Sequence, residues 1–451
     1  MGRRSTRRAR LLAGTVVVGA VLAAGCGSSS GSGAGGGSAG SGGSGSKVSA
    51  GSALTIADVA PFTGTDAALG PTYLVSCDAA TNAIDSAGGV LGHKLNCKSV
   101  DTRGDPADAV PAVHQMYAST SSLAFVIGCT SDEAASVVPV FASNKTVSFC
   151  MTGQSEFDHV KFPYFYRLVP PDLSESYAMV AIAKNRGYKK VALAFGNDIG
   201  SQTFIAPAIA AIKTAGLQVV SNQTLDLSAS TFRTEAAKIA NSKPDVILTE
   251  ALGPTEASFL TELKQLNGGK MIPVIGTSAT ISPDWFKSVS SAIGGSTLAG
   301  DFQADNLVTE SSGPAFSAFA KAIDAEKGKV GTTGDFSTYL TAPGAVHLYD
   351  GINLGALAMI AAHSTSPAKY MPFILKIGDG VPGATVVNSF AQGAAALKAG
   401  KQIRYEGPGG PTSFDAYHDS AGLFQVDTYT ANGTVKVAGN LSTTELRSLG
   451  L

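Results

Sequence analysis

Two hydroxyl residues, Thr130 and Ser131, stand where a strand-like apolar segment, residues 123–128, is followed by a helical pattern. The first backbone N–H groups of a helix have no partner within it, so these groups and the two hydroxyls can hold a carboxylate or a carbonyl. Simple capping is the alternative; it stabilises a helix by about 1 kcal/mol and needs no ligand. Thr130 and Ser131 are therefore the first candidates for a binding site.

The first 25 residues predict a secretory signal peptide. Five arginines precede a short apolar run, residues 11–24, whereas a membrane span needs about 20 residues. The segment Leu22-Ala23-Ala24-Gly25-Cys26 resembles the bacterial lipobox, in which the cysteine becomes the acylated first residue of the mature protein. We therefore predict residues 1–25 to be a lipoprotein signal peptide and Cys26 to be lipidated. An ordinary signal peptide with an incidental cysteine is the alternative.

The composition changes after Cys26. Residues 26–52 are predicted to be the lipidated cysteine and a flexible tether, because Gly and Ser dominate this stretch. The remaining chain is globular, and about 400 residues are too many for one core, so two domains are expected. The whole chain has 33 basic and 34 acidic residues, and removal of the five leader arginines leaves a net charge of −6. A nucleic-acid partner is not expected, because such proteins carry a basic face.

Four cysteines lie in the body of the chain: Cys77, Cys97, Cys129 and Cys150. An even number in an exported protein suggests two disulfides, for which three pairings exist. We favour Cys129–Cys150, because both residues fall at the carboxyl ends of strands separated by one helix, and Cys77–Cys97, because the helix of Cys77 leads directly to the strand of Cys97. Free buried thiols are the alternative. Without a C-x-x-C motif, and with six scattered histidines, no metal or other cofactor is expected.

Strand and helix patterns alternate in two blocks, which Pro170-Pro171 separates. The strands are near-continuous apolar runs, as in parallel sheets that are buried on both faces. They are predicted at residues 54–60, 94–101, 123–128 and 146–150, and at 190–195, 217–224, 246–250 and 273–276. Near the end, Asn432-Gly433 predicts a hairpin turn. We therefore predict an α/β fold with two doubly wound parallel-sheet lobes.

Several short segments follow one another in an informative order: Ala60-Pro61-Phe62-Thr63-Gly64, residues 87–92, 101–106, 126–131, Tyr349-Asp350-Gly351, residues 407–415 and 431–434. In this order and spacing the chain resembles the leucine/isoleucine/valine-binding proteins. These are type I periplasmic binding proteins that feed ATP-driven (ABC) importers. The likeness runs from Ala53 to about Gly439.

The resemblance implies two lobes, each built from discontinuous chain and joined by a three-strand hinge. Lobe I would comprise residues 53–170 with 302–424, and lobe II would comprise residues 171–301 with 425–451. The ligand would bind between the lobes, where strand ends and helix N-termini face each other, as is general for open parallel sheets.

The resemblance also implies the site residues of lobe I. In the family, the position of Thr130 and Ser131 binds the carboxylate of the ligand. A second contact loop is similar to the segment after residues 146–150, which makes Thr152, Gly153, Gln154 and Ser155 candidates; an ordinary polar turn is the alternative.

Lobe II departs from the family pattern. Ile199 stands where a tyrosine is usual, and Ser278 or a neighbour stands where the family has an acid for the ammonium group of an amino acid. Glu250 and Asp198 are candidates for a replacement charge, with capping or solvated roles as the alternative. A buried ammonium without an anion is costly, so these changes favour a ligand without an α-ammonium, such as an amide or a carboxylic acid.

Three classes of function remain. The resemblance implies solute capture by a lipid-anchored protein outside the cytoplasm, on the outer face of the cytoplasmic membrane or in the periplasm, with delivery to ABC permease subunits. A sensor or co-receptor would use the same cleft without transport. An exported hydrolase would need a nucleophile on a sharp turn, and the sequence has no G-x-S-x-G motif. We therefore expect a binding protein and not an enzyme.

Overall fold

The computed structural model describes residues 51–451, except 65, 161, 330–335 and 421. The predicted signal peptide, Cys26 and almost all of the tether therefore lie outside the described residues. The described residues belong to one compact unit, residues 45–451. None of the helices described in it is long and apolar enough to cross a membrane.

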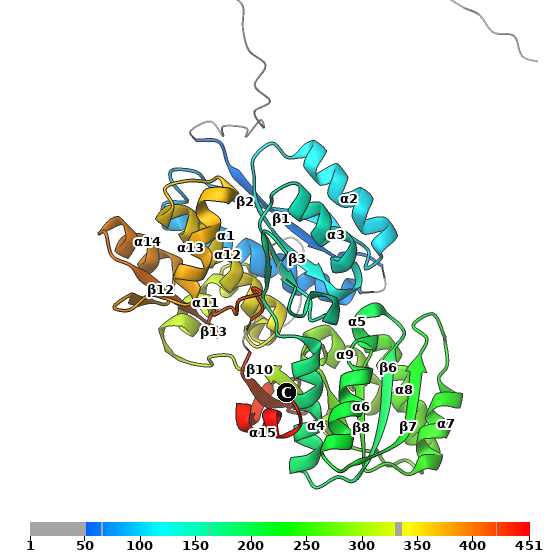
Figure 1. Cartoon of the computed structure of the whole chain (residues 1–451). Helices are drawn as coiled ribbons and strands as arrows, with labels where there is room; N and C mark the ends of the chain where they lie inside the picture. The colour runs from blue at the N-terminus through cyan, green and yellow to red at the C-terminus, as the bar shows by residue number, and fades with distance from the viewer. Residues whose placement is uncertain (1–50, 65, 161, 330–335, 421) are drawn as a thin grey trace, which may run out of the picture. The chain divides into compact units, whose positions relative to one another are not determined.

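The first part of the chain forms a parallel sheet, in which five strands are described, in the order β2-β1-β3-β4-β5 (Figure 1). Side chains alternate between the two faces of β1: Leu54 and Ile56 join one core, and Ala57 and Val59 join the other. Both faces are therefore buried, which is why the strand reads as an unbroken apolar run. The strands are β1 (Leu54–Ala60), β2 (Leu95–Asp101), β3 (Leu123–Thr130), β4 (Ser148–Met151) and β5 (Phe165–Arg167).

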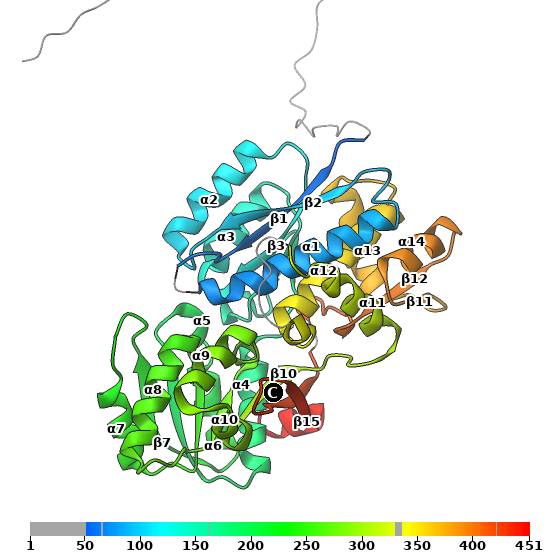
Figure 2. The same ribbon diagram turned by 180° about the vertical axis from the view of Figure 1, so that it is seen from behind.

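Helices cover both faces of this sheet. The face seen in Figure 1 carries α2 (Pro106–Ser119) and α3 (Ser131–Ser143). The opposite face, seen in Figure 2, carries α1 (Gly70–Ser86) and α12 (Pro343–Ala361), with α11 (Gly313–Asp324) beside them. The sheet and these helices thus bring together segments far apart in the sequence.

A second sheet has seven described strands, in the order β15-β14-β10-β9-β8-β6-β7. The strands from β6 to β10 pair in parallel, whereas β14 and β15 pair antiparallel. Asn432 and Gly433 lie in the turn between β14 and β15, which confirms the predicted hairpin. The strands are β6 (Lys190–Gly196), β7 (Gln218–Leu225), β8 (Val246–Glu250), β9 (Val274–Gly276), β10 (Phe302–Leu307), β14 (Phe424–Tyr429) and β15 (Val435–Leu441).

This sheet also lies between two layers of helices. One core contains residues of α4 (Asp172–Asn185), α6 (Ile205–Thr214) and α15 (Thr443–Ser448). The other contains residues of four helices, which are α7 (Arg233–Ser242), α8 (Gly253–Leu266), α9 (Pro283–Ile293) and α10 (Gly295–Asp301). A short α5 (Ile199–Gln202) precedes α6.

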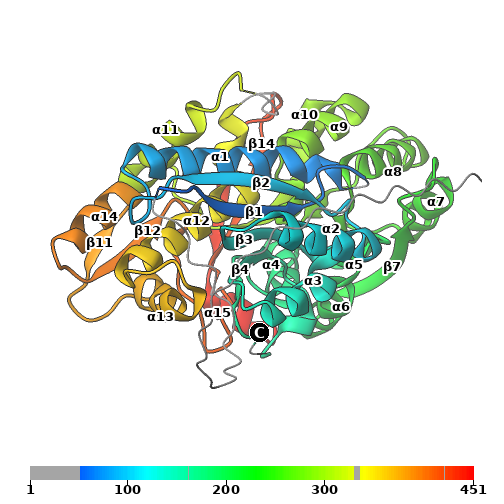
Figure 3. The same cartoon turned by 90° about the horizontal axis from the view of Figure 1, so that it is seen from above.

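A small third sheet lies beside the first one (Figure 3). Its strands β11 (Thr385–Val387), β12 (Ile403–Gly407) and β13 (Gly410–Pro411) accompany α13 (Pro367–Gly378) and α14 (Phe390–Lys398). We use "lobe I" for the first and third sheets with their helices, and "lobe II" for the seven-stranded sheet with its helices.

Three chain segments connect lobe I with lobe II. They follow β5, β10 and β13, so each lobe is built from discontinuous chain. The predicted lobe boundaries stay a prediction. One strand bears on them: β10 starts at residue 302, where a return to lobe I was expected, but it pairs with β9 and β14 in the seven-stranded sheet.

Two disulfides are present in the described part of the chain, and they are the pairs that we favoured from the sequence. Cys77 on α1 is bonded to Cys97 on β2, and Cys129 near the end of β3 is bonded to Cys150 on β4. Each bond joins neighbouring elements of lobe I, and the second lies directly before Thr130 and Met151.

Candidate functional site

A cleft of about 180 Å³ has walls from both lobes. Its lobe I wall is formed at the ends of β3 and β4 and at the start of α1, and its lobe II wall is formed where β6, β8 and β9 end. The carboxyl ends of parallel strands leave helix N-termini and loop side chains facing outward, which is where open α/β sheets bind ligands. The predicted candidates that line the cleft are Thr130, Ser131, Gly153, Asp198, Glu250 and Ser278.

Thr130 and Ser131 occupy adjacent positions but have different partners. The Thr130 backbone N–H donates to Glu133 Oε1 at 2.9 Å, and its hydroxyl donates to Glu133 Oε2 at 2.7 Å. Thr130 therefore caps the helix, which is the alternative to ligand binding given in the sequence analysis. Ser131 has a looser contact, with its hydroxyl 3.3 Å from that of Thr152. Ser131 is thus the better placed of the two to meet a ligand.

The second predicted contact loop reaches the cleft only through Gly153. Thr152 is buried behind Ser131, and Gln154 is buried with its carbonyl accepting a hydrogen bond from Arg167. Ser155 is exposed and starts a short 3₁₀ helix, away from the residues that line the cleft. Three of these four candidates therefore do not line the cleft, and any ligand contact by this loop is through Gly153.

Gly153 lies against the first helix of lobe II. Its carbonyl accepts a hydrogen bond from the Asp172 backbone N–H at 2.7 Å. A Cβ atom at this position would lie 1.8 Å from Asp172 Oδ1, so a larger residue cannot fit without movement of Asp172. Asp172 Oδ2 in turn accepts a hydrogen bond from the Thr203 hydroxyl at 2.5 Å.

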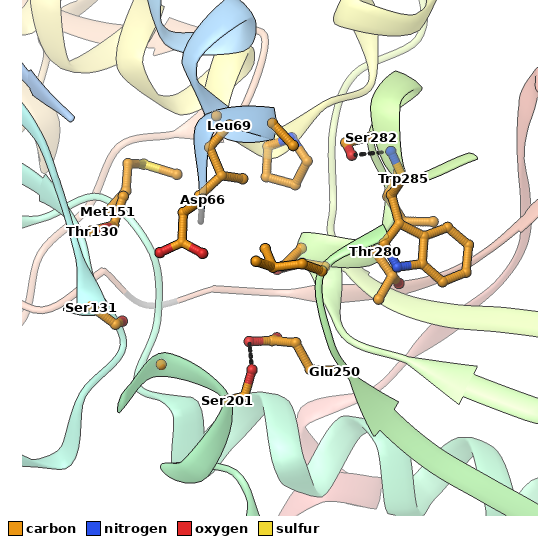
Figure 4. Close-up of a pocket in the computed structure, with 18 of the residues that line it drawn as sticks. Asp66, Leu69, Thr130, Ser131, Met151, Ser201, Glu250, Thr280, Ser282 and Trp285 are labelled. Atoms are coloured by element: carbon orange, nitrogen blue, oxygen red, sulfur yellow. Dashed lines mark hydrogen bonds between the residues drawn. The ribbon is translucent and has the colours of Figure 1, made fainter. Parts of the chain in front are cut away.

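Glu250 ends β8, and both of its carboxylate oxygens accept hydrogen bonds. The Ser201 hydroxyl donates to Oε1 at 3.4 Å, and the Thr277 hydroxyl donates to Oε2. Burial and the charges of Asp198, Glu175 and Asp172 raise the pKa of Glu250 well above its ordinary value, although the bond from Thr277 opposes this shift. Figure 4 shows Glu250 and Ser201 in the same space as Asp66 of lobe I.

Asp198 caps a helix with one carboxylate oxygen, and its other oxygen has no partner in the described part of the chain. Its Oδ1 accepts a hydrogen bond from the Ser201 backbone N–H at 2.7 Å, at the start of α5. Its Oδ2 is buried and has no hydrogen-bond partner in the described part of the chain. Burial and the charge of Asp132 raise the pKa of Asp198.

Ser278 lines the cleft next to an acid that the family comparison did not predict. Its backbone N–H donates to Glu175 Oε1 at 2.9 Å. Glu175 comes from α4, so the acid next to Ser278 is contributed by another element. The residues next to Ser278 in the sequence include no acid, but Glu175 lies beside Ser278 in the folded structure.

Sequence reasoning missed four carboxylates of the cleft: Asp66, Asp132, Asp172 and Glu175. Asp132 follows Ser131 directly and lies in the first turn of α3. Acids are common in the first turn of a helix because of the helix dipole, so an aspartate there did not indicate a binding site. Its Oδ1 accepts a hydrogen bond from the Gly200 backbone N–H of lobe II at 3.0 Å. Proximity of these acids depends on how the lobes fold together, which no local pattern encodes.

Asp66 has a strongly raised pKa. It lies in the loop after β1, and its side chain is directed into the cleft (Figure 4). Burial, a hydrogen bond with Asp132, and the charges of Asp132, Asp198 and Glu133 raise the pKa of Asp66 to about 9. Burial likewise raises the pKa of Asp172 to about 8.

An apolar surface faces these acids. Leu69 and Met151 come from lobe I, and Phe204, Leu252 and Trp285 come from lobe II. Trp285 is the sole tryptophan of the sequence. It stacks on Tyr429, and its Nε1–H donates to the carbonyl of Ala251 at 3.2 Å, so it is both part of the core and a wall of the cleft.

Neither a cluster of three or more residues placed to hold a metal ion nor a metal-binding motif is found in the described ranges. A second cavity of about 160 Å³ lies beside the connecting segments and is lined by residues that include Leu168, His347 and Ser413.

Comparison with known proteins identifies the family. A family model described as "Periplasmic binding protein" matches residues 53–430. The chain belongs to the periplasmic binding protein family. The resemblance seen in the sequence is thereby confirmed, and the family acts on the extracytoplasmic side of the membrane.

A curated relative is the Leu/Ile/Val-binding protein BraC3 of Rhizobium johnstonii, which is 27% identical over 248 residues. The match covers 54% of this chain and 66% of that relative, slightly less than two thirds of its length.

Solved structures confirm the α/β fold of type I periplasmic binding proteins. A leucine-binding protein from Thermotoga maritima superposes with a TM-score of 0.69 at 18% identity, over 87% of this chain and 99% of that one. A fatty acid ABC transporter substrate-binding protein from Thermomonospora curvata gives 0.70 at 16% identity, over 89% and 94%. The two proteins have different ligand classes by name, so similarity of fold does not identify a ligand.

Proposed function

We propose that this periplasmic binding protein captures a small polar solute in the cleft between its lobes and delivers it to the permease of an ABC importer. The observation that carries the proposal is the cleft itself, because residues of both lobe I and lobe II line it. Closure of two lobes around a ligand is a motion that three connecting segments permit. Leucine- and fatty-acid-binding neighbours of the same fold support solute capture as the general activity.

We further propose that lipidation of Cys26 holds the protein at the membrane. The lipobox-like segment supports this, and the Gly/Ser-rich segment that follows would let the folded unit move above the bilayer. Several acyl chains suffice for stable anchoring, because each buried CH₂ contributes about 0.8 kcal/mol. A Cys26→Ser variant is expected to leave the membrane fraction, and equal membrane retention of the variant and the wild type would contradict the anchor.

A thermal-shift screen of the compact unit, residues 45–451, tests solute capture. The library holds amino acids, amides, amines, aliphatic and aromatic carboxylates, and sugars. A ligand at 100 times its Kd stabilises the folded state by about 2.7 kcal/mol, which raises the Tm by about 3 °C or more for a chain of this size. Absence of any shift across the library would contradict solute capture. Delivery is tested separately, by loss of uptake of the identified solute when the gene is deleted.

A further inference from the structure

The cleft has an uneven balance of charge. Six carboxylates line it, and the described lining residues include no lysine, arginine or histidine. Three of the acids form one group across both lobes, because the charges of Asp132 and Asp198 raise the pKa of Asp66, and the charge of Asp132 also raises the pKa of Asp198. Like charges so close together and away from bulk water cannot all be ionised without a counter-charge.

Asp66 is a buried acid of the cleft whose carboxyl receives no hydrogen bond from an amide, a hydroxyl or a cation of the described residues. Its residue surface is only 4% exposed, and its side chain is directed into the cleft (Figure 4). Among the described residues, the group that hydrogen-bonds with its carboxyl is another carboxyl, that of Asp132, and no amide, hydroxyl or cation is seen to donate to it. Burying a carboxylate without donors costs several kcal/mol, so a ligand that supplies N–H donors and positive charge would be strongly favoured here.

The opposite wall repeats the pattern. Asp198 Oδ2 is buried without a hydrogen-bond partner among the described residues, and Glu250 receives only neutral hydroxyl donors, from Ser201 and Thr277. Both lobes therefore contribute hydrogen-bond acceptors to the cleft. Neither lobe contributes a cationic side chain among the described lining residues, so a positive charge would have to come from the ligand.

We propose that the solute is a small organic cation, an aliphatic amine or diamine, whose ammonium group lies between Asp66 of lobe I and Glu250 and Asp198 of lobe II. A primary ammonium carries three N–H donors, which match the carboxylates and the hydroxyls of Ser131 and Ser201. The hydrocarbon part packs against Leu69, Met151 and Trp285. A ligand α-carboxylate is disfavoured, because the described lining residues include no lysine, arginine or histidine to pair with it, so the ligand is not an ordinary amino acid.

This inference rests on the proposed function and changes the ligand class expected from the sequence. The missing acid near Ser278 suggested a ligand without an ammonium group. The structure supplies acids from other elements instead, namely Asp66, Asp132 and Glu175. An ammonium in the cleft would therefore not be left unpaired, because these acids can ionise beside it.

Calorimetric titration with four matched compounds tests the inference on residues 45–451. They are 3-methylbutylamine, leucine, 4-methylpentanoate and 1,4-diaminobutane: an amine, the same skeleton with a carboxylate added, the same skeleton with only the carboxylate, and a diamine. One or both amines are expected to bind at least about tenfold more tightly than leucine and 4-methylpentanoate, because charged hydrogen bonds to the acids of the cleft favour the ammonium group. Preference for leucine or for the carboxylate would overturn the cation assignment while leaving solute capture intact.

The outcomes also separate the two proposals. If neither amine binds but a neutral or anionic compound of the wider library does, the protein captures a solute and the cation assignment is wrong. If no compound of any class binds, both proposals fail.

Three variants locate the ammonium. Asp66→Asn and Glu250→Gln each remove one carboxyl that can ionise beside a bound ammonium, and each is expected to weaken amine binding about tenfold or more. Glu256→Gln is the matched control, because Glu256 is a buried carboxylate that accepts a hydrogen bond from Thr249 but does not line the cleft. The variants should fold, because each amide has nearly the same shape as the carboxyl that it replaces, and the Tm without ligand checks this. Amine affinity that is unchanged in both cleft variants, or equally reduced in the control, would overturn the inference.

Discussion

Thr130 and Ser131 are neighbouring hydroxyl residues at the start of α3, but they have different roles: Thr130 caps the helix, and Ser131 faces the cleft. The hydroxyl and N–H of Thr130 are both taken up by Glu133, whereas the Ser131 hydroxyl has one long contact and lines the cleft. Thr130 thus stabilises the start of α3, and Ser131 is available to the solute.

Replacement of Ser131 by Ala tests this division. The expected result is weaker solute binding, by about two- to tenfold, because one hydrogen bond contributes about 0.5–1.5 kcal/mol. Ser155→Ala serves as the control, since Ser155 is exposed and does not line the cleft. Titration calorimetry measures both. Equal effects of the two substitutions would show that position in the cleft is not what matters.

Gly153 is the residue at which a single methyl group should disturb the cleft. A Cβ atom there would lie 1.8 Å from Asp172 Oδ1, so Asp172 must move, and the hydrogen bond of Thr203 to it must change. We expect Gly153→Ala to destabilise the protein by about 1–3 kcal/mol, as overpacking does, and to weaken solute binding. Gly300→Ala is the control, because nothing lies within 4 Å of a Cβ at that helical position. Urea unfolding that shows similar stability for both variants would contradict the close contact.

At this scale, the sequence predicted the parts of the site that follow from local pattern. Thr130, Ser131 and Gly153 stand directly after strands, and that position alone places them at the cleft. Asp66 and Glu175 were missed because, in the sequence, an acid in a loop and an acid in a helix look like ordinary solvated residues. Only the folded structure, in which the two lobes face each other, shows that both line the cleft.

The two disulfides act at the scale of elements. Cys77–Cys97 fastens α1 to the edge strand β2, whereas Cys129–Cys150 joins β3 to β4 immediately before Thr130 and Met151. The second bond therefore supports the wall of the cleft, and the first supports only the lobe.

Removal of each disulfide should distinguish these roles. A Cys77→Ala/Cys97→Ala variant and a Cys129→Ala/Cys150→Ala variant are each expected to lose about 3 kcal/mol of stability, since the closed loops are of similar length, 20 and 21 residues apart. Only the second pair of substitutions should also weaken solute binding. Equal binding losses in both variants, measured below their unfolding temperatures, would contradict a special role for Cys129–Cys150.

The elements themselves were largely predictable, because parallel strands buried on both faces are continuous apolar runs and the segments between them have helical spacing. The predicted strand at residues 54–60 coincides with β1, and the strand at 246–250 coincides with β8. The break between α5 and α6 was not predicted, because the residues around it are all compatible with a helix. The membership of β10 in the seven-stranded sheet depends on pairing with β9 and β14, which sequence alone does not specify.

Buried acids make the whole molecule sensitive to pH. Burial raises the pKa of Glu133 to about 7 and the pKa of Glu256 to about 8, and Asp172 and Asp66 reach about 8 and 9. In the unfolded chain the pKa of such groups is about 4, so raising the pH removes protons from the unfolded state first. Stability from these groups is therefore full at low pH and is lost as the pH rises through their folded pKa values.

We expect the Tm of the protein without ligand to fall by several degrees between pH 6.5 and pH 8.5. This window avoids His347, whose pKa burial lowers to about 4 and which therefore acts only at lower pH. Scanning calorimetry measures the trend, and Glu256→Gln should make it shallower. A Tm that rises over this interval would contradict the assignment of these acids as protonated in the folded state.

The central claim is that a solute bridges the two lobes, and the most direct test is a crystal structure grown with the tightest ligand from the screen. We expect ligand density in the cleft, within hydrogen-bonding distance of Asp66 or Ser131 on one side and of Glu250, Asp198 or Ser201 on the other. Density in the second cavity beside His347, or contacts to one lobe alone, would contradict it.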